Sequence, residues 1–393
     1  MTKRLIPAVV VALVLSTWSL GRATAEHFET LAEAQAAAAA QEKPLLIDFF
    51  ADWCGPCKAF TKATSEDADI QKLLESVILY KVDAEKGDGI ELAKTHEVHA
   101  YPTFMMVDAK LQPVDRWLGY SKDYFQSKMD NALVDVSTIE DKRARFEKSP
   151  SADLAARLAG VEEAYGRYAP AVAYYHKAQE LDPGTSRAAE IFDATYSGYR
   201  SKEKVFDAAE VRKAADQALS GAEPGDILDI CAQMAQVAKQ NEDAPMRAQY
   251  LKTAIESTQS SQDPGVLARR ESLMPEYMLY VEKNPAKAVE LKRAAMREGW
   301  MEDAGQLNSY AWWAFENGVD QEEALALARK GIELAAPGRA KAQILDTAAE
   351  LCNALNNCHE SVDLTKLAMA EDPDSEYYKK QLDRFQEILA SKD

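Results

Sequence analysis

Two cysteines stand three residues apart in the stretch "ADWCGPCKAF" (51–60), where a glycine and a proline separate Cys54 from Cys57 and a tryptophan precedes them. Such spacing serves metal binding, a structural disulfide or electron exchange. Zinc needs four ligands, and the histidines of "HEVHAYP", His96 and His99, do not form the usual zinc pattern with a Gly-Pro-separated pair. A structural disulfide across so small a loop adds little stability. Labile disulfides are the catalytic ones, so the pattern favours redox exchange.

The residues before the pair predict how it is positioned. The run "LLIDFFA" (45–51) is apolar except for one aspartate, which is typical of a strand buried on both faces. A short loop and a helix beginning near Cys54 should follow. A cysteine at a helix N-terminus meets free N–H groups and the positive end of the helix dipole, which lowers its pKa. We expect Cys54 to be the exposed attacking sulfur and Cys57 the resolving one, with Pro56 in the first helical turn.

Strand-like and helix-like runs alternate from residue 44 to residue 133, which predicts a small α/β sheet. Further strands are expected at 77–84, 103–109 and, at an edge of the sheet, 115–120, and helices at 28–43, 57–75 and 88–95.

The strand pattern stops after residue 135, and the charged segment 137–150 is expected to be a helix end and linker. The remaining chain is alanine-rich and helical in pattern, with breaks at Asp-Pro or Pro-Gly. Segment 165–183 has the offsets of a helical repeat, 354–373 keeps the last of these intervals, and 307–337 fits with one extra residue before its proline. Together they resemble a divergent tetratricopeptide-repeat array. Between 190 and 300 the match is poor and paired helices alone are expected. An irregular helical domain is the alternative.

Residues 45–58 resemble the active-site segment of the thioredoxin family, and the span 44–133 follows that family's order of elements. The resemblance implies that Asp48 is the buried aspartate that moves a proton to or from Cys57, and that Lys81 is its partner. A carboxylate inside an apolar strand is costly without a purpose. The alternatives are a structural role for Asp48 and an ordinary edge charge for Lys81.

The stretch "HAYPT" (99–103) is similar to the family's cis-proline loop. The resemblance implies that Pro102 lies against the disulfide and that Tyr101 offers backbone hydrogen bonds to an extended substrate, although Tyr101 could simply pack. Gly119 matches a late glycine of the family. Substrate contacts are thereby expected from Trp53, Gly55, Pro56, Tyr101, Pro102 and Thr103.

The chain begins with a basic Met1–Arg4 segment, an apolar run, and Ala23-Thr24-Ala25, the pattern of a secretory signal peptide cleaved after Ala25. An uncleaved anchor is the alternative. No later stretch is apolar for long enough to cross a bilayer, so no membrane span is expected in the mature form. The expected parts are a signal peptide (1–25), a thioredoxin-like domain (26–135), a helical linker (136–150) and a repeat domain (151–393).

The net charge and the number of cysteines limit which partners and which kinds of disulfide are expected. A formal charge of −18 repels nucleic acid and anionic lipid. Five cysteines in 393 residues are too few for a disulfide scaffold. Cys352 and Cys358 flank a turn, where a disulfide would add about 2 kcal/mol; reduced core cysteines, or a metal site with His359, are the alternatives. Cys231 is expected to be a small buried hydrophobe.

These patterns predict a periplasmic thiol–disulfide oxidoreductase without a cofactor, acting on protein disulfides or thiols. The Gly-Pro dipeptide between the cysteines resembles reducing thioredoxins, whereas "AYPT" resembles protein disulfide isomerase, so oxidase-like or isomerase-like exchange is the alternative. The family implies a membrane thiol-transfer protein as electron donor. The repeats are expected to bind a protein partner; a repeat-type adaptor with an accessory redox domain is a further alternative.

Overall fold

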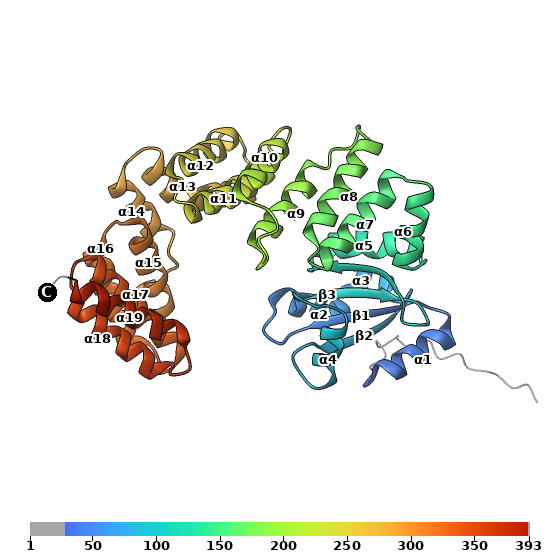
Figure 1. The fold of residues 1–393 in the computed structure, drawn as a ribbon, viewed down its shortest axis with the longest axis horizontal. Helices are drawn as coiled ribbons and strands as arrows, with labels where there is room; N and C mark the ends of the chain where they lie inside the picture. Colours follow the sequence, from blue (N-terminus) through green and yellow to red (C-terminus); the bar gives the residue numbers. More distant parts are fainter. Residues whose placement is uncertain (1–27, 392–393) are drawn as a thin grey trace, which may run out of the picture. The chain divides into compact units, whose positions relative to one another are not determined.

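A computed structural model describes residues 28–391, which divide into two compact units, one ending at Asp207 and the other beginning at Ala208 (Figure 1). The predicted signal peptide and its cleavage site lie outside the described residues. The first unit contains a small mixed sheet flanked by helices, and the second is entirely helical, which confirms the predicted fold class. Within 28–391, no helix combines the length and the apolar character that crossing a bilayer requires.

The sheet has four strands in the order β2-β1-β3-β4. Its strands are β1 (Leu45–Phe50), β2 (Ile78–Asp83), β3 (Thr103–Val107) and β4 (Pro113–Leu118). Strand β1 runs parallel to β2 and antiparallel to β3, and β4 pairs antiparallel with β3. All four strands occur where the sequence predicts them, and β4 lies at an edge, as expected.

Helices cover both faces of this sheet. They are α1 (Leu31–Gln41), α2 (Gly55–Glu66), α3 (Ala68–Leu74), α4 (Asp88–Thr95) and α5 (Lys122–Val134). Helices α1 and α4 pack on one face, and α2, α3 and α5 on the other. The predicted helix 57–75 is interrupted at Asp67, whose carboxylate accepts the backbone N–H groups of Asp69 and Ile70 and so caps α3.

Four more helices complete the first unit, namely α6 (Ile139–Lys148), α7 (Ala152–Ala164), α8 (Tyr168–Leu181) and α9 (Ala188–Arg200). The span of the expected linker, 136–150, contains α6, which packs against β4 and α7. Lys142 of α6 is fully buried, and its ammonium donates to the backbone carbonyl of Val114 in β4 at 2.7 Å. The outer strand of the sheet is therefore covered by the helices that follow it.

A buried arginine fastens these helices to the sheet. Arg116 of β4 is 1% exposed, and its guanidinium donates to the backbone carbonyls of Ala164 (3.0 Å), Glu97 (2.8 Å) and His96. It also lies over the ring of Tyr165, 4.2 Å from the centroid. One side chain therefore joins β4, the end of α4 and the end of α7.

Replacing Arg116 with methionine is expected to lower the free energy of unfolding of the first unit by about 3 kcal/mol, because three backbone carbonyls, one of them buried, lose a charged donor. Urea unfolding followed by tryptophan fluorescence measures this change. The matched control is Arg200→Met, at the exposed end of α9, with an expected change within about 0.5 kcal/mol. Equal stabilities of the two variants would show that Arg116 does not hold the helices to the sheet.

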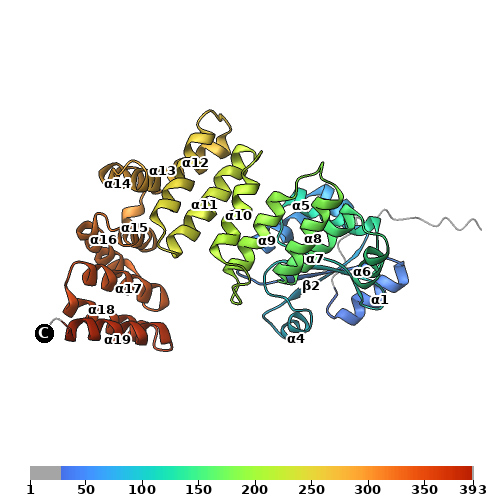
Figure 2. The ribbon, with the colours of Figure 1, turned by 45° about the horizontal axis from the view of Figure 1, so that its top comes forward.

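The second unit is a succession of helices that pack on their chain neighbours (Figure 2). They are α10 (Ala208–Ala218), α11 (Pro224–Gln240), α12 (Ala244–Thr258), α13 (Pro264–Tyr280), α14 (Pro285–Ala294), a 3₁₀ turn (Trp300–Glu302), α15 (Ala304–Asn317), α16 (Gln321–Leu334), α17 (Arg339–Ala354), α18 (Cys358–Glu371) and α19 (Glu376–Ala390). Prolines in the first turn and Asp or Asn caps explain many of the helix starts. The segments predicted as repeats contain α8, α15 with α16, and α18, and helices fill the poorly matching 190–300.

Candidate functional site

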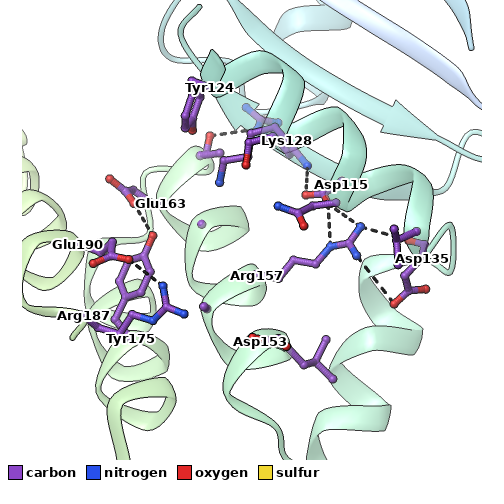
Figure 3. A pocket seen from close by; sticks show the side chains of 18 of the residues that line it. Asp115, Tyr124, Lys128, Asp135, Asp153, Arg157, Glu163, Tyr175, Arg187 and Glu190 are labelled. Carbon is purple, nitrogen blue, oxygen red and sulfur yellow. Dashed lines mark hydrogen bonds and ion pairs between the residues drawn. The ribbon is translucent and has the colours of Figure 1, made fainter. Parts of the chain in front are cut away.

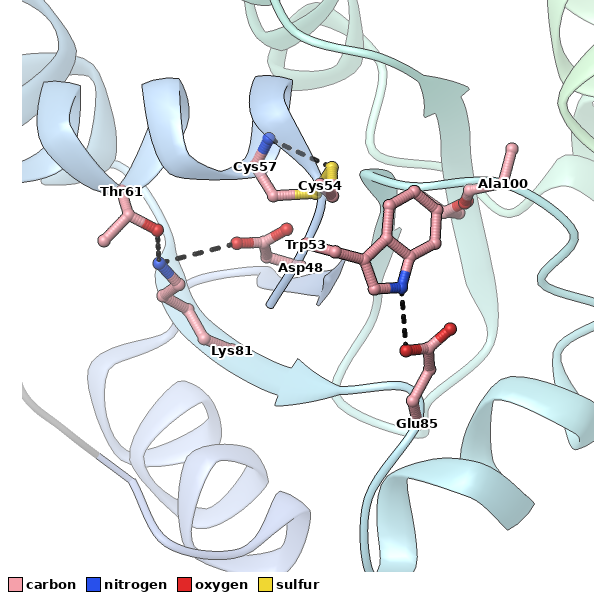
Figure 4. The surroundings of a disulfide bond; sticks show 9 residues. Asp48, Trp53, Cys54, Cys57, Thr61, Lys81, Glu85 and Ala100 are labelled. Carbon is pink, nitrogen blue, oxygen red and sulfur yellow. Dashed lines mark hydrogen bonds and ion pairs between the residues drawn. A yellow bond between two sulfur atoms is a disulfide. The ribbon is translucent and has the colours of Figure 1, made fainter. Parts of the chain in front are cut away.

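The two cysteines of the CxxC motif form a disulfide at the start of α2 (Figure 4). Cys54 is the N-cap residue of the helix, and its sulfur accepts the backbone N–H of Cys57 at 3.2 Å. Pro56 stands in the first turn, as predicted, and Gly55 is the first helical residue. In the reduced protein, the same N–H group and the helix dipole would stabilise a thiolate at Cys54.

The exposure expected for Cys54 is wrong for this oxidised form. Cys54 and Cys57 are each 3% exposed. Ala51, Phe50 and Tyr101 pack around the pair and form a small apolar cluster with it. The prediction failed because it considered the helix end alone, whereas residues from β1 and the loop before β3 also cover the sulfur.

Asp48 is a fully buried carboxylate on β1. It shares a sheet face with Leu46, two residues earlier, and this face packs against α2. Neither carboxylate oxygen has a hydrogen-bond partner among residues 28–391. Burial raises the pKa of Asp48 to about 7, and the charge of Lys81 opposes this rise. Asp48 is thus an acid that changes protonation near neutral pH.

Lys81 is the residue of β2 that pairs with Asp48 in the sheet register. Its ammonium lies 3.8 Å from a carboxylate oxygen of Asp48 and donates to the Thr61 hydroxyl at 2.6 Å (Figure 4). Burial lowers the pKa of Lys81, and Asp48 opposes this. Thr61 was not among the predicted site residues, although it stands four residues after Cys57 and therefore on the same face of α2.

The loop before β3 contains a cis peptide bond between Tyr101 and Pro102, as the sequence predicts. The backbone N–H of Gly119, which has a positive φ of 78°, donates to the Pro102 carbonyl at 2.8 Å. The Thr103 side chain is fully buried, and its hydroxyl donates to the Ala100 carbonyl at 2.7 Å. Any contact of Thr103 with a substrate would therefore use its backbone.

Trp53 is the large exposed side chain beside the disulfide, with 68% of its surface accessible. Its indole N–H donates to a carboxylate oxygen of Glu85 at 2.9 Å, and its ring lies edge-on to Tyr101 with centroids 5.9 Å apart. Glu85 was also not among the predicted site residues. The order of the strands could have indicated it, because Trp53 and Glu85 follow the parallel strands β1 and β2, whose carboxyl ends lie at one edge of the sheet.

The other three cysteines form no disulfide and are buried. Cys352, in the last turn of α17, and Cys358, at the start of α18, flank a turn as predicted, but the disulfide considered between them is not formed. Cys352 instead packs in the apolar core of the second unit. Burial raises the pKa of Cys231 and of Cys352 to about 12, so these thiols are poor nucleophiles near neutral pH. Cys231 is a small buried residue, as expected.

Comparisons with known proteins agree with this geometry. The sequence model of the thioredoxin-like family matches residues 25–109. The chain is 32% identical over 126 residues to the thiol:disulfide interchange protein DsbD of Salmonella typhi, covering 29% of this chain and 22% of that protein. It is 33% identical over 116 residues to the Klebsiella pneumoniae protein of the same name, with 27% and 19% covered. The chain thus spans about one fifth of the length of these relatives.

Among solved structures, a Thermus thermophilus thioredoxin is similar over 28% of this chain and 89% of its own, with 23% identity and a TM-score of 0.26. A tetratricopeptide repeat protein from Parabacteroides merdae is similar over 67% of this chain and 96% of its own, with 14% identity and a TM-score of 0.41. Residues 25–109, which contain the Cys54–Cys57 pair at the start of α2, thus match the thioredoxin-like family.

Proposed function

We propose that the protein is a thiol–disulfide oxidoreductase that exchanges two electrons between the Cys54–Cys57 pair and a disulfide in another protein. The observation that supports this most is the disulfide at the N-terminus of α2, on the sheet face that carries the buried Asp48. Substrate contacts are proposed for the exposed Trp53 and for the loop at Tyr101 and Pro102.

In the reductive direction, the Cys54 thiolate attacks one sulfur of the substrate disulfide, and a mixed disulfide forms as the other substrate sulfur leaves as a thiolate. Cys57 then loses its proton to the Asp48 carboxylate and attacks the Cys54 sulfur. The Cys54–Cys57 disulfide forms as the bond between Cys54 and the substrate breaks, and the substrate leaves with both its sulfurs reduced, the second as a thiolate that takes a proton from solvent. The positive charge of the Lys81 ammonium favours the ionised form of Asp48 and so keeps a fraction of this carboxyl ionised near neutral pH.

Reduction is the proposed direction because a Gly-Pro dipeptide separates the cysteines. Regeneration of the dithiol then requires an electron donor, and we propose a membrane thiol-transfer protein in a periplasmic setting. The relatives named as thiol:disulfide interchange proteins support this choice. The helices of the second unit are proposed to bind a protein partner.

A Cys57→Ser variant of the full-length protein should retain partners as mixed disulfides on Cys54, because the resolving thiol is missing. Captured proteins should be released by dithiothreitol and identified by mass spectrometry. The matched control is the double variant Cys54→Ser/Cys57→Ser, which should capture nothing. Equal capture by the single and double variants would refute the assignment of Cys54 as the attacking sulfur.

A further inference from the structure

Two hollows differ in how their charges are balanced. The larger, of about 870 Å³, lies in the first unit between β4, α5, α7, α8 and α9 (Figure 3). Two of its arginines are paired with its own acids: Arg157 donates to Asp115 at 2.8 Å, and Arg187 lies 2.9 Å from Glu190. Each of these two arginines thus has an acidic partner inside the pocket.

The second hollow, of about 400 Å³, lies in the second unit between α15, α17 and the start of α19. Its wall contains Asp346, which is 8% exposed. The Asp346 carboxylate accepts hydrogen bonds from the Tyr377 hydroxyl at 3.0 Å and the Gln381 amide at 3.4 Å. Both donors are neutral, and among the described residues no Lys or Arg forms an ion pair with Asp346. Arg384 pairs instead with Glu350.

A second acceptor in this wall is unused. The side-chain oxygen of Asn308 is buried and has no hydrogen-bond partner within residues 28–391. Trp312, four residues later on α15, lines the same hollow and adds an aromatic surface, as does Tyr377. The lining therefore combines a carboxylate, a free amide oxygen and aromatic rings, all of which favour a ligand with several N–H donors and a positive charge.

The hollow's own arginine does not fill it. Arg339 stands at the rim, with 84% of its side chain exposed, and lies 3.6 Å from Asp372, which supplies a second carboxylate. The surroundings are acidic as well, because residues 208–393 contain 32 Asp and Glu against 21 Lys and Arg. The excess of acidic residues would thus attract a cation from solution towards the hollow.

We propose that this hollow binds an arginine side chain of the protein partner. A guanidinium has five N–H donors in a planar fork, so that it can reach the Asp346 carboxylate and the Asn308 oxygen together while it stacks on Trp312 or Tyr377. A lysine ammonium presents a point charge and should bind more weakly. The inference rests on the proposed function in one respect, that the second unit docks a partner.

The test titrates the full-length protein, labelled with ¹⁵N at its tryptophan indoles, with N-acetyl-arginine amide. The Trp312 signal is assigned by its loss in Trp312→Phe. We expect a saturable shift of this signal, a smaller one with N-acetyl-lysine amide, and none with N-acetyl-citrulline amide, which is neutral and similar in shape. Asp346→Asn should weaken arginine binding at least tenfold.

The matched control is Asp363→Asn, which removes one negative charge from an exposed position on α18 and should bind like the wild type. A second pocket variant, Asn308→Leu, removes the free acceptor without breaking a hydrogen bond of the Asn308 oxygen, and it should also weaken binding if Asp346→Asn fails to fold. Equal shifts with citrulline, or equal weakening by Asp363→Asn, would overturn the proposal.

The same preparation separates this inference from the proposed function. Insulin reduction by the wild-type protein tests the cysteine chemistry independently of ligand binding in the hollow. A protein that reduces insulin but shows no Trp312 response refutes the arginine site alone. A protein that binds arginine but does not reduce insulin refutes the oxidoreductase assignment and leaves the hollow as a binding site.

Discussion

Cys54→Ser is expected to reduce insulin no faster than dithiothreitol does by itself. A serine hydroxyl does not ionise near neutral pH, so the N-terminus of α2 has no thiolate to stabilise, and neither the mixed disulfide nor the Cys54–Cys57 disulfide can form. The measurement is the turbidity of reduced insulin with dithiothreitol as electron source, at equal protein concentrations.

The control for this variant is Cys231→Ser, which also removes one sulfur. Cys231 is free, buried in α11 and far along the chain from the disulfide, so the rate should equal that of the wild type. A Cys54→Ser protein that keeps the wild-type rate would show that the activity does not come from the CxxC pair.

Asp48→Asn is expected to stabilise the first unit by about 4 kcal/mol at pH 8 and by almost nothing at pH 4. One pKa unit is worth about 1.4 kcal/mol, and burial raises the pKa of Asp48 from 3.8 to about 7. Because this folded-state pKa lies above the unfolded one, the wild type loses stability as pH rises from about 4 to 7, and the loss stays constant at higher pH. Asparagine carries no charge to bury and escapes this loss.

Urea unfolding of both proteins at pH 4, 6 and 8 measures the difference. A difference that stays the same at all three pH values would show that Asp48 does not titrate in this range. Insulin reduction by Asp48→Asn should fall by about tenfold to a hundredfold at pH 7, because Cys57 loses its base, and the pH–rate profile should lose its step near pH 7. A stabilised variant with an unchanged rate would make Asp48 a structural residue.

The chemistry of the site could be predicted from the sequence because its signals are local. The Cys54–Cys57 spacing, the acid at Asp48 inside an apolar strand and the proline at 102 are each read within a few residues. The features that were missed depend on contacts between distant residues. Arg116 reaches the carbonyl of Ala164, 48 residues away, and no periodicity marks such a pair.

The packing of residues 136–150 on the sheet could not be predicted either, because it also depends on contacts between distant residues. Residues 136–150 are charged and end at a proline, which is typical of a connection between domains. The ammonium of Lys142 nevertheless reaches a carbonyl of the sheet and is fully buried there, which charge patterning alone argues against. The helical repeats could be recognised where alanines and closing prolines keep their offsets, and not between 190 and 300, where packing is achieved by other residues.

The covering of β4 by α6 and α7 has a consequence for solubility. An outer strand with free backbone groups is a template on which another molecule can add a strand, and proteins commonly block it with charges or a covering element. Here the blocking group is the Lys142 ammonium, which donates a hydrogen bond to the Val114 carbonyl. A fragment that ends before α6 would reopen this strand to intermolecular pairing. The shortest well-behaved form of the part that contains the disulfide is therefore expected to include α6 and α7.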